Sequence, residues 1–423
     1  MIQGGGSMDI NEYIFIGIDL HKKTHTAVIV DHLGHKLDRI TFNNVTKGFE
    51  DLEKKVDICL RKAEKAALCK LSPFFCLENP GEYGRALTAM LLGRGYIVKD
   101  INPALSNRQA KHRAMYRKSD EDDALAIAYV GIREFDHLPQ AYPADVYWSV
   151  KQLIHRRDNL SKYRVRLINQ LHEQLHNSFP YYDKFFKDIS RPTALFFFKT
   201  FPSRESLSGL SAEDIGQSFR AAGMRSCPLK KCEFILDTVN SDKTLYYDHQ
   251  ASADLVTRTL ISDITHTVDT ISEIDAELEN LYRELNLTLT TIPGVNTIMA
   301  MKLIAEIGNI ERFRSSERLA KYAGIAPMPY GSAGKNRDCA AKQGNRKLQA
   351  AFYYLAIQQI QISVNKVPRN PYFRSFYEKK LQEGKRPKQA LICIARKLVK
   401  IVYSMLKKHS TYTLLATHEN DET

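Results

Sequence analysis

The chain has 423 residues, of which 43% are hydrophobic, so it can bury more than one core and we expect two or three domains. Its net charge of +13 favours a polyanionic partner. No apolar run reaches the roughly 20 residues that a membrane helix needs, which excludes a membrane protein. Seven scattered cysteines form no disulfide framework. We therefore expect a cytoplasmic protein that contacts no membrane.

The first elements predict a β-sheet. Residues 1–7 end in Gly-Gly-Gly-Ser and are interpreted as an appended linker. From Tyr13 to Val30, two apolar runs flank a polar break at residues 21–24, which is typical of a β-hairpin, and a third strand is expected over 36–42. Apolar residues at helical spacing then predict a helix over 49–70, which we expect Pro73 to end.

The next elements alternate between strand and helix. We expect a strand over 74–77, a helix over 82–93, a strand over 96–101 and a helix through 119–133. The resulting order predicts a mixed sheet with helices on its faces. The first domain is placed at residues 8–145.

A central helical region is predicted over residues 146–285. Two long amphipathic helices, 148–177 and 254–285, keep near-heptad apolar spacing. An antiparallel hairpin or a coiled-coil oligomer contact is compatible with this pattern, and ordinary bundle packing is equally so. A polar stretch near 205–250 resembles an insert. The first helix is strongly basic, and we place nucleic-acid contacts at Arg156 and Arg157.

The last domain is predicted to be mostly helical over residues 286–408, with a tail at 409–423. An Ile-Pro-Gly-Val turn at Gly294 precedes an apolar helix predicted over 298–307. Such a turn and helix can bind a DNA backbone, and they can equally be a helix-turn-helix unit that only packs in the core. Residues 364–408 carry 13 Lys and Arg against 2 Glu, interleaved with aromatic residues. We expect nucleic-acid contacts here, at Arg374, Lys385 and Arg386.

Four carboxylates are predicted to meet at one edge of the sheet. Asp19 ends the first strand, Glu78 ends the fourth, and Asp120 and Asp123 share a helix face because they are one turn apart. Like charges at close range raise each other's proton affinity, and divalent cations relieve this. The hard oxygen ligands favour Mg²⁺ or Mn²⁺, as a pair of ions around a phosphate.

Several motifs together resemble those of one family. In the first half these are Ile-Gly-Ile-Asp19, Leu-Glu78-Asn-Pro-Gly, Asn102-Pro and Lys118-Ser-Asp120-Glu-Asp-Asp123-Ala. In the second half they are Ile-Pro-Gly294, Ala305-Glu-Ile-Gly308, Tyr322-Ala-Gly324-Ile-Ala-Pro327, Ser332-Ala-Gly-Lys335 and Lys342-Gln-Gly344-Asn345. The chain resembles the insertion-sequence one-ten family of transposases, which includes the bridge-RNA-guided recombinases and the Piv invertases.

The resemblance implies a fold, an activity and partners. The first domain would be an RNase H-like (RuvC-like) domain of the DEDD type, so the fold class is α/β plus α. Ser332 would be a nucleophile that forms a 5′-phosphoserine during strand exchange. A structured noncoding RNA would pair with donor and target DNA, and a dimer would assemble into a tetramer.

The residues around Ser332 are compatible with that role. Gly331, Ala333 and Gly334 predict a loop of small residues that a phosphate can approach closely. Three cations are assigned to nucleic-acid binding: Lys335, Arg337 and Lys342. The family's Ser-Gly-Gly-Lys is Ser-Ala-Gly-Lys here, and residues 338–341 lack the expected β-branched residues, which leaves the loop conformation open.

Three other functions share features with this sequence. The nearest is a hydrolytic RuvC-like nuclease or resolvase, in which Ser332 only binds phosphate. An actin-like sugar kinase shares the first hairpin but needs a Gly-rich nucleotide loop that we do not find. A packaging protein without enzymatic activity explains the charge and leaves the carboxylates without a role.

Overall fold

The computed structural model describes residues 9–414, except 79–82, 102, 113–118, 137, 142–145, 180, 225–226, 242–247, 327, 333–334 and 340–343. Within these limits, only the backbone is described for 104, 110–112, 328–332 and 335–339. The chain divides into two compact units, one of residues 1–151 with 286–423 and one of residues 152–285. In the described part of the chain, no helix is long and apolar enough to cross a bilayer.

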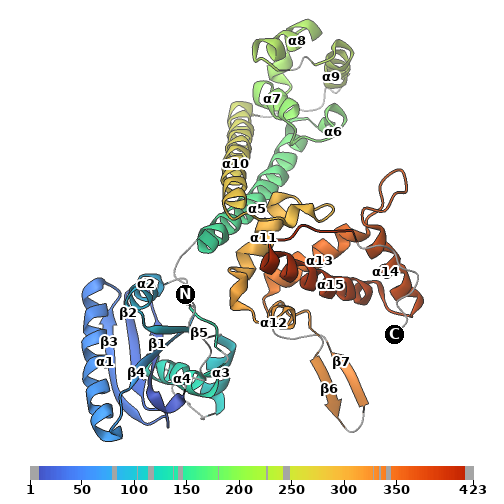
Figure 1. Cartoon of the computed structure of the whole chain (residues 1–423). Coiled ribbons are helices and arrows are strands. Elements are labelled where there is room, and N and C mark those ends of the chain that lie inside the picture. The colour runs from blue at the N-terminus through green and yellow to red at the C-terminus, as the bar shows by residue number, and fades with distance from the viewer. Residues whose placement is uncertain are drawn as a thin grey trace. The chain divides into compact units, whose positions relative to one another are not determined.

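A five-stranded mixed sheet forms the N-terminal part, as the sequence predicted (Figure 1). Its strands are β1 (Tyr13–Leu20), β2 (Thr24–Val30), β3 (Lys36–Asn43), β4 (Ser72–Glu78) and β5 (Ile97–Ile101). They lie in the order β3-β2-β1-β4-β5. The β1–β2 and β2–β3 pairs are antiparallel, whereas β4 runs parallel to both β1 and β5. The carboxyl ends of β1 and β4 therefore lie side by side.

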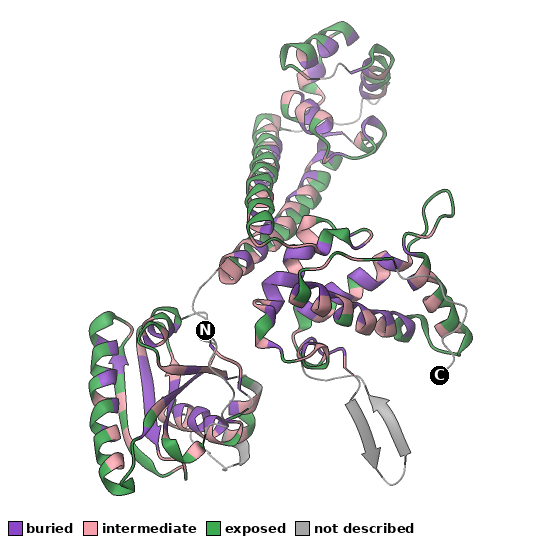
Figure 2. Cartoon of the chain, in the orientation of Figure 1, coloured by how far each residue is buried: buried purple, intermediate pink, exposed green. Residues whose placement is uncertain are grey.

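Helices cover both faces of this sheet. Alternate residues of β1 point to opposite faces, so Ile16 packs in a core with α1 (Thr46–Ala67) and α2 (Arg85–Gly93), and Phe15 packs in a core with α4 (Asp120–Arg133). The central strands β1, β2 and β4 are accordingly buried along most of their length (Figure 2). This double cover explains why the central strands read as nearly continuous apolar runs.

Two local expectations about this part were wrong. Helix α1 ends at Ala67, where Leu68 adopts a left-handed conformation with φ 54°, and Pro73 lies inside β4 rather than ending the helix. A further helix that we did not predict, α3 (Pro103–His112), follows β5. The sequence of α3 is mostly polar, so it lacks the strong amphipathic pattern that predicts a helix.

The second unit is helical. Helices α5 (Val146–Ser178) and α10 (Gln250–Glu284) are the two long helices of the prediction. The described residues between them form four shorter α-helices: α6 (Tyr182–Phe185), α7 (Pro192–Thr200), α8 (Ala212–Ala221) and α9 (Leu229–Ser241). Phe219 and Ile235 share one core with Leu171 of α5 and Phe197 of α7. The described residues of the 205–250 stretch thus contribute to this unit's own core.

In the C-terminal part the longest helix, α15 (Pro387–Lys408), packs against α12 (Ser316–Tyr322), α13 (Arg346–Ile360) and α14 (Pro371–Gln382), and α11 (Thr297–Ile307) packs against α13. Leu355 of α13 and Leu398 of α15 are fully buried. Two strands, β6 (Met328–Ser332) and β7 (Lys335–Cys339), form an antiparallel hairpin. Residues 331–332 and 335–337, which we expected to form a loop, therefore lie in strands. Their polar composition gave no indication of strand pairing.

Candidate active site

The register of the sheet brings Asp19 and Glu78 together. Ile18 pairs with Leu77 across the parallel strands β1 and β4, and Asp19 and Glu78 follow these two residues. Parallel strands present their carboxyl ends at one edge of a sheet, which is where ligands bind in open α/β folds. Both side chains are partly shielded from solvent.

Gly17 lets α4 bring the other two carboxylates to the same edge. A Cβ at Gly17 would lie 2.1 Å from the Ala124 carbonyl oxygen and 2.4 Å from the Ala128 nitrogen, so only glycine allows α4 to pack directly on β1. Ser119 caps the helix by accepting a hydrogen bond from the Asp122 amide. Asp120 and Asp123 thus lie in the first turn, beside the end of β1.

His21 joins two of these carboxylates, a role that the sequence did not reveal. Its Nε2 lies 3.0 Å from Asp19 Oδ2 and 3.3 Å from Asp120 Oδ1. These three side chains offer one ligand atom each within 4.8 Å of one another. His21 was visible in the sequence only as part of the polar break after the first strand, which reads equally well as a turn.

Two of the carboxyl groups, Asp19 and Glu78, have pKa values that neighbouring carboxylates help to raise. Burial raises the pKa of Asp19, His21 lowers it, and Asp123 and Asp120 raise it again, for a net increase. Burial likewise raises the pKa of Glu78, with further increases from Asp19 and Asp123. The cluster therefore carries more negative charge than its own surroundings neutralise.

Ser106 of α3 is a second residue that sequence reasoning missed. Its hydroxyl donates a hydrogen bond to Glu78 Oε2 and lowers the pKa of that carboxyl, which opposes part of the increase from burial. Ser106 is itself buried. Because it lies on the unpredicted helix α3, no pattern in the sequence pointed to it.

The donor set fits a divalent metal. Four carboxylates supply hard oxygen ligands, the chemistry that Mg²⁺ and Mn²⁺ prefer, and the raised pKa values of Asp19 and Glu78 show that a nearby cation would be stabilising. His21 adds a nitrogen that Mn²⁺ accepts more readily than Mg²⁺ does.

Ser332 is the last residue of β6 and pairs with Lys335 of β7, next to the turn of the hairpin. Arg337 pairs with Tyr330 further along. The side chains of Ser332, Lys335 and Arg337 lie outside the described residues, as does all of Lys342. The backbone nevertheless places the serine and one cation as neighbours at the end of a two-stranded ribbon.

The motif residues of the C-terminal part hold the base of this ribbon. Gly344, with φ 134°, lies so close to Gly324 that a Cβ on Gly344 would meet the Gly324 Cα at 2.5 Å. Next to it, Asn345 donates hydrogen bonds from Nδ2 to Glu306 Oε2 at 2.7 Å and to the Tyr322 hydroxyl at 3.3 Å. Segments that are far apart in sequence are thereby fixed at the point where the hairpin begins and ends.

Comparison with known proteins agrees with this arrangement. Residues 16–180 match the model of the IS110 DEDD domain, described as a transposase, and residues 286–378 match the model described as the transposase IS116/IS110/IS902 family. The chain carries both transposase domains of the IS110 family. It is a transposase, an enzyme that cleaves and rejoins DNA strands.

Relatives of the transposase match along most of its length. The 44.8 kDa protein of insertion element IS116 from Streptomyces clavuligerus is 24% identical over 95% of this chain and 97% of its own. The pilin gene-inverting protein of Moraxella lacunata is 23% identical over 94% of this chain and 97% of its own. The transposase of insertion sequence element IS1111A from Coxiella burnetii is 22% identical over 76% of this chain and 74% of its own.

Some of the basic residues predicted to bind nucleic acid form ion pairs within the transposase, and others are exposed. Arg157 of α5 forms a two-pronged ion pair with Asp275 of α10, with Nη2 3.0 Å from Oδ2, whereas the neighbouring Arg156 is exposed. Arg374 of α14 is bound by Glu378 at 2.6 Å. Lys385 and Arg386 are exposed between α14 and α15. An internal ion pair competes with phosphate for a cation, so Arg156, Lys385 and Arg386 are the better placed of the five.

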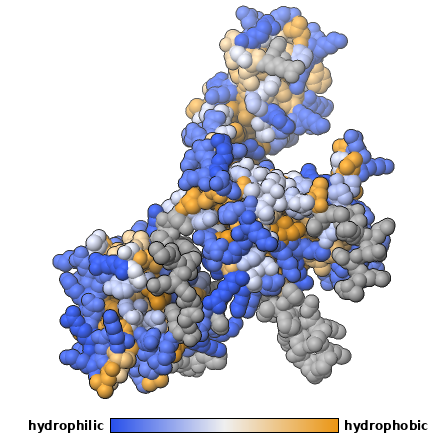
Figure 3. All heavy atoms as spheres, in the orientation of Figure 1, coloured by the Kyte–Doolittle hydropathy of each residue, from blue (hydrophilic) through white to orange (hydrophobic). Residues whose placement is uncertain are grey.

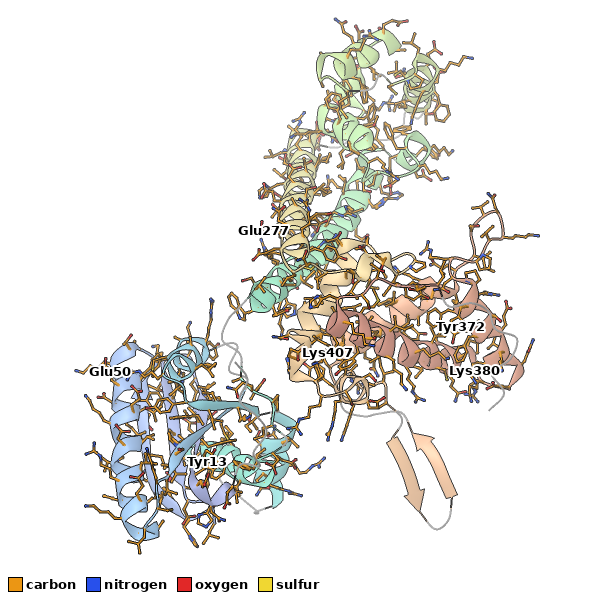
Figure 4. All side chains as sticks on the ribbon, in the orientation of Figure 1. Tyr13, Glu50, Glu277, Tyr372, Lys380 and Lys407 are labelled. Carbon is orange, nitrogen blue, oxygen red and sulfur yellow. The ribbon has the colours of Figure 1, made fainter. Side chains whose placement is uncertain are left out.

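Aromatic residues support the basic surface of α14. Tyr372 and Lys380, both labelled in Figure 4, lie on this helix, and the ring of Tyr372 stacks with Phe376 at a centroid distance of 6.5 Å. Lys397 of α15 lies 4.6 Å from the Phe376 centroid, and Lys380 lies 5.2 Å from it. These contacts hold lysine side chains in an ordered array on a folded surface.

Proposed function

We propose that this transposase is an RNA-guided DNA recombinase, in which Ser332 attacks the scissile phosphate while Asp19, Glu78, Asp120 and Asp123 act in the same composite site. The four-carboxylate cluster carries the proposal, because three separate elements bring mutually repelling groups to one sheet edge. The sheet order and the covering helices support an RNase H-like, RuvC-like domain.

In this proposal the carboxylates hold two Mg²⁺ or Mn²⁺ ions. When bound, such a pair stabilises negative charge on the attacking and leaving oxygens of a phosphate. The chain's own residues supply the frame: Gly17 seats α4 against β1, Ser106 orients Glu78, and His21 holds Asp19 and Asp120 in place. Their task is to keep the carboxylates fixed before DNA arrives.

The serine performs the exchange of esters. The Ser332 oxygen attacks phosphorus and gives up its proton, and the bond from phosphorus to the 3′ oxygen breaks as that oxygen takes up a proton. One piece of the strand is thereby released with a 3′-hydroxyl, while the other piece stays joined to the serine through its 5′-phosphate. Attack by the 3′-hydroxyl of another strand reverses the step and frees the serine. One phosphate ester replaces another each time, so no external energy source is required. Lys335, Arg337 and Lys342 would balance the charge of the phosphate.

Donor DNA, target DNA and a structured guide RNA are the proposed partners, and the basic surfaces support binding of polyanions. We further propose a dimer that assembles into a tetramer, because strand exchange needs several cleavage centres. Exposed apolar residues on the long helices support such a contact, among them Val165 on α5 and Leu255 on α10, which are 54% and 61% exposed.

Trapping the covalent intermediate tests the serine. Wild-type protein incubated with end-labelled DNA and Mg²⁺ should yield a protein–DNA adduct that survives denaturation. Ser332→Ala should bind DNA and form no adduct, and Asp19→Ala should also lose it, while Ser332→Cys retains a trace. Metal-dependent cleavage without any adduct would identify a hydrolytic nuclease instead.

Recovery of bound RNA tests the guide. Sequencing of RNA that copurifies with the transposase should return one structured species whose loops pair with DNA at the ends of the insertion. A random sample of cellular RNA would contradict guidance and leave the serine chemistry untouched.

A further inference from the structure

A short hairpin projects from the C-terminal part between α13 and α14. It comprises residues 361–369 and is visible in Figure 1 as the loop that precedes α14. The Arg369 amide donates to the Gln361 carbonyl at 2.8 Å, and the Ser363 amide donates to the Val367 carbonyl at 2.9 Å. The Lys366 amide closes the turn on the Ser363 carbonyl at 2.9 Å. The projection therefore has a defined shape of its own.

The tip of this hairpin is apolar although it points into solvent. Val364 is fully exposed at 101%, Val367 is 61% exposed and Ile362 is 47% exposed. Hydrophobic atoms accordingly appear among hydrophilic ones on this projection (Figure 3). Three β-branched side chains at an exposed turn cost solvation free energy unless a partner covers them.

The base of the hairpin is anchored to the Ile-Pro-Gly turn before α11. The side chain of Arg369 lies across Gly294, where an added Cβ would meet its Cδ at 2.7 Å. Gln359 Nε2 donates to the Pro293 carbonyl at 2.8 Å, and Asn370 Nδ2 donates to Gln359 Oε1 at 2.9 Å. Gly294, with φ 78°, thus leaves the space that the Arg369 side chain occupies, and these contacts fix the base of the hairpin to the segment before α11.

The charge around the tip selects a polyanion as partner. No Asp or Glu occurs in the hairpin, residues 361–369, whereas Lys366 and Arg369 lie in it. Lys366 stands at the turn itself, next to the exposed valines. Proteins that bend DNA through the minor groove combine apolar side chains, which wedge between base pairs, with cationic side chains close by.

We propose that the 361–369 hairpin is a DNA wedge, which inserts Val364 at a base step of the bound duplex while Lys366 and Arg369 contact the flanking phosphates. The wedge bends and unstacks DNA on the C-terminal part of the transposase, a task separate from strand cleavage. Steps that unstack easily, such as TA, would be its preferred sites.

Permanganate oxidation of thymines tests the wedge, because the reagent attacks unstacked thymines. Plasmid-derived duplex is probed in EDTA, so that cleavage cannot create reactive ends. Wild-type protein should produce hyperreactive thymines at TA steps. Val364→Ser should lower this reactivity about tenfold at equal DNA occupancy. Lys366→Ala should weaken binding and reduce the salt slope by about one, yet retain hyperreactivity at saturation.

Leu68→Ser is the matched control, because Leu68 is a 92% exposed apolar residue at the end of α1 in another part of the chain. It should leave both readouts unchanged. Thymine reactivity that is absent in wild type, or that persists in Val364→Ser, would overturn the proposal. A change of oligomeric state in Val364→Ser with reactivity retained would also overturn it, and would assign the hairpin to a protein contact. None of these outcomes depends on Ser332.

Discussion

His21 Nε2 lies 3.0 Å from Asp19 Oδ2, inside a cluster that otherwise contains only carboxylates. The contact gives Asp19 a partner before any metal binds, and the same imidazole reaches Asp120. His21 therefore has two opposed consequences. It lowers the pKa of Asp19 in the metal-free site, and it occupies a carboxylate oxygen that Mg²⁺, which prefers oxygen to nitrogen ligands, would also use.

His21→Ala should accordingly lower the melting temperature of the metal-free protein and enlarge the rise in melting temperature that Mg²⁺ causes. The first effect follows from the lost partner of Asp19, and the second from the removal of a competitor for its oxygen. Thermal unfolding with and without Mg²⁺ measures both. A smaller Mg²⁺-induced rise than in wild type would show instead that His21 is a metal ligand.

Asp19→Asn should stabilise the metal-free protein at neutral pH and abolish strand cleavage. Burial raises the pKa of Asp19 in the folded state, so the ionised group opposes folding above that pKa. The penalty falls as the pH drops through the raised pKa and vanishes below the carboxyl's ordinary value. The stability difference between variant and wild type should therefore be present at pH 7 and lost in acid. Destabilisation at pH 7 would contradict a repulsive cluster.

Substitutions of the neighbouring residues Arg157 and Arg156 should affect different properties, stability for the first and nucleic-acid binding for the second. Arg157→Ala breaks the ion pair with Asp275 that joins α5 to α10, and should lower the free energy of unfolding by about 1 kcal/mol, since the pair is bidentate but partly exposed. Arg156→Ala should leave stability unchanged and weaken nucleic-acid binding. Thermal unfolding and binding titrations at several salt concentrations separate the two. Equal losses of stability would contradict this division of roles.

Gly344→Ala should be far more damaging than Gly384→Ala. Both glycines have positive φ, 134° and 80°, so each substitution costs roughly 1–2 kcal/mol of backbone strain. Only at Gly344 would the new Cβ also collide with backbone, at 2.5 Å from Gly324 Cα, whereas Gly384 has open space. Gly344→Ala should thus displace the base of the Ser332 hairpin and lower the adduct yield. A yield equal to that of Gly384→Ala would mean that the close glycine contact does not position the hairpin.

The long elements could be predicted from sequence because their apolar periodicity is strong. The sheet strands, α1, α4, α5 and α10 were found within a few residues of their observed ends. Helix α3 and the β6–β7 hairpin escaped, since both are polar and their backbone pairing leaves no mark in apolar spacing. Pro73 led to a wrong prediction because proline occurs both just after a helix and near the start of a strand. Here it lies in β4 and pairs with Ile14.

The sequence by itself determined the long elements, the candidate carboxylates and the family, because strand ends, helix spacing and motifs are local properties of the chain. Only the tertiary structure decided what surrounds them. Asp19 and Asp120 share His21, Glu78 receives a hydrogen bond from Ser106, and Gly294 accommodates Arg369, which lies 75 residues further along the chain. Such contacts depend on the distance between side chains in space, which packing of the core sets and which spacing along the chain does not encode.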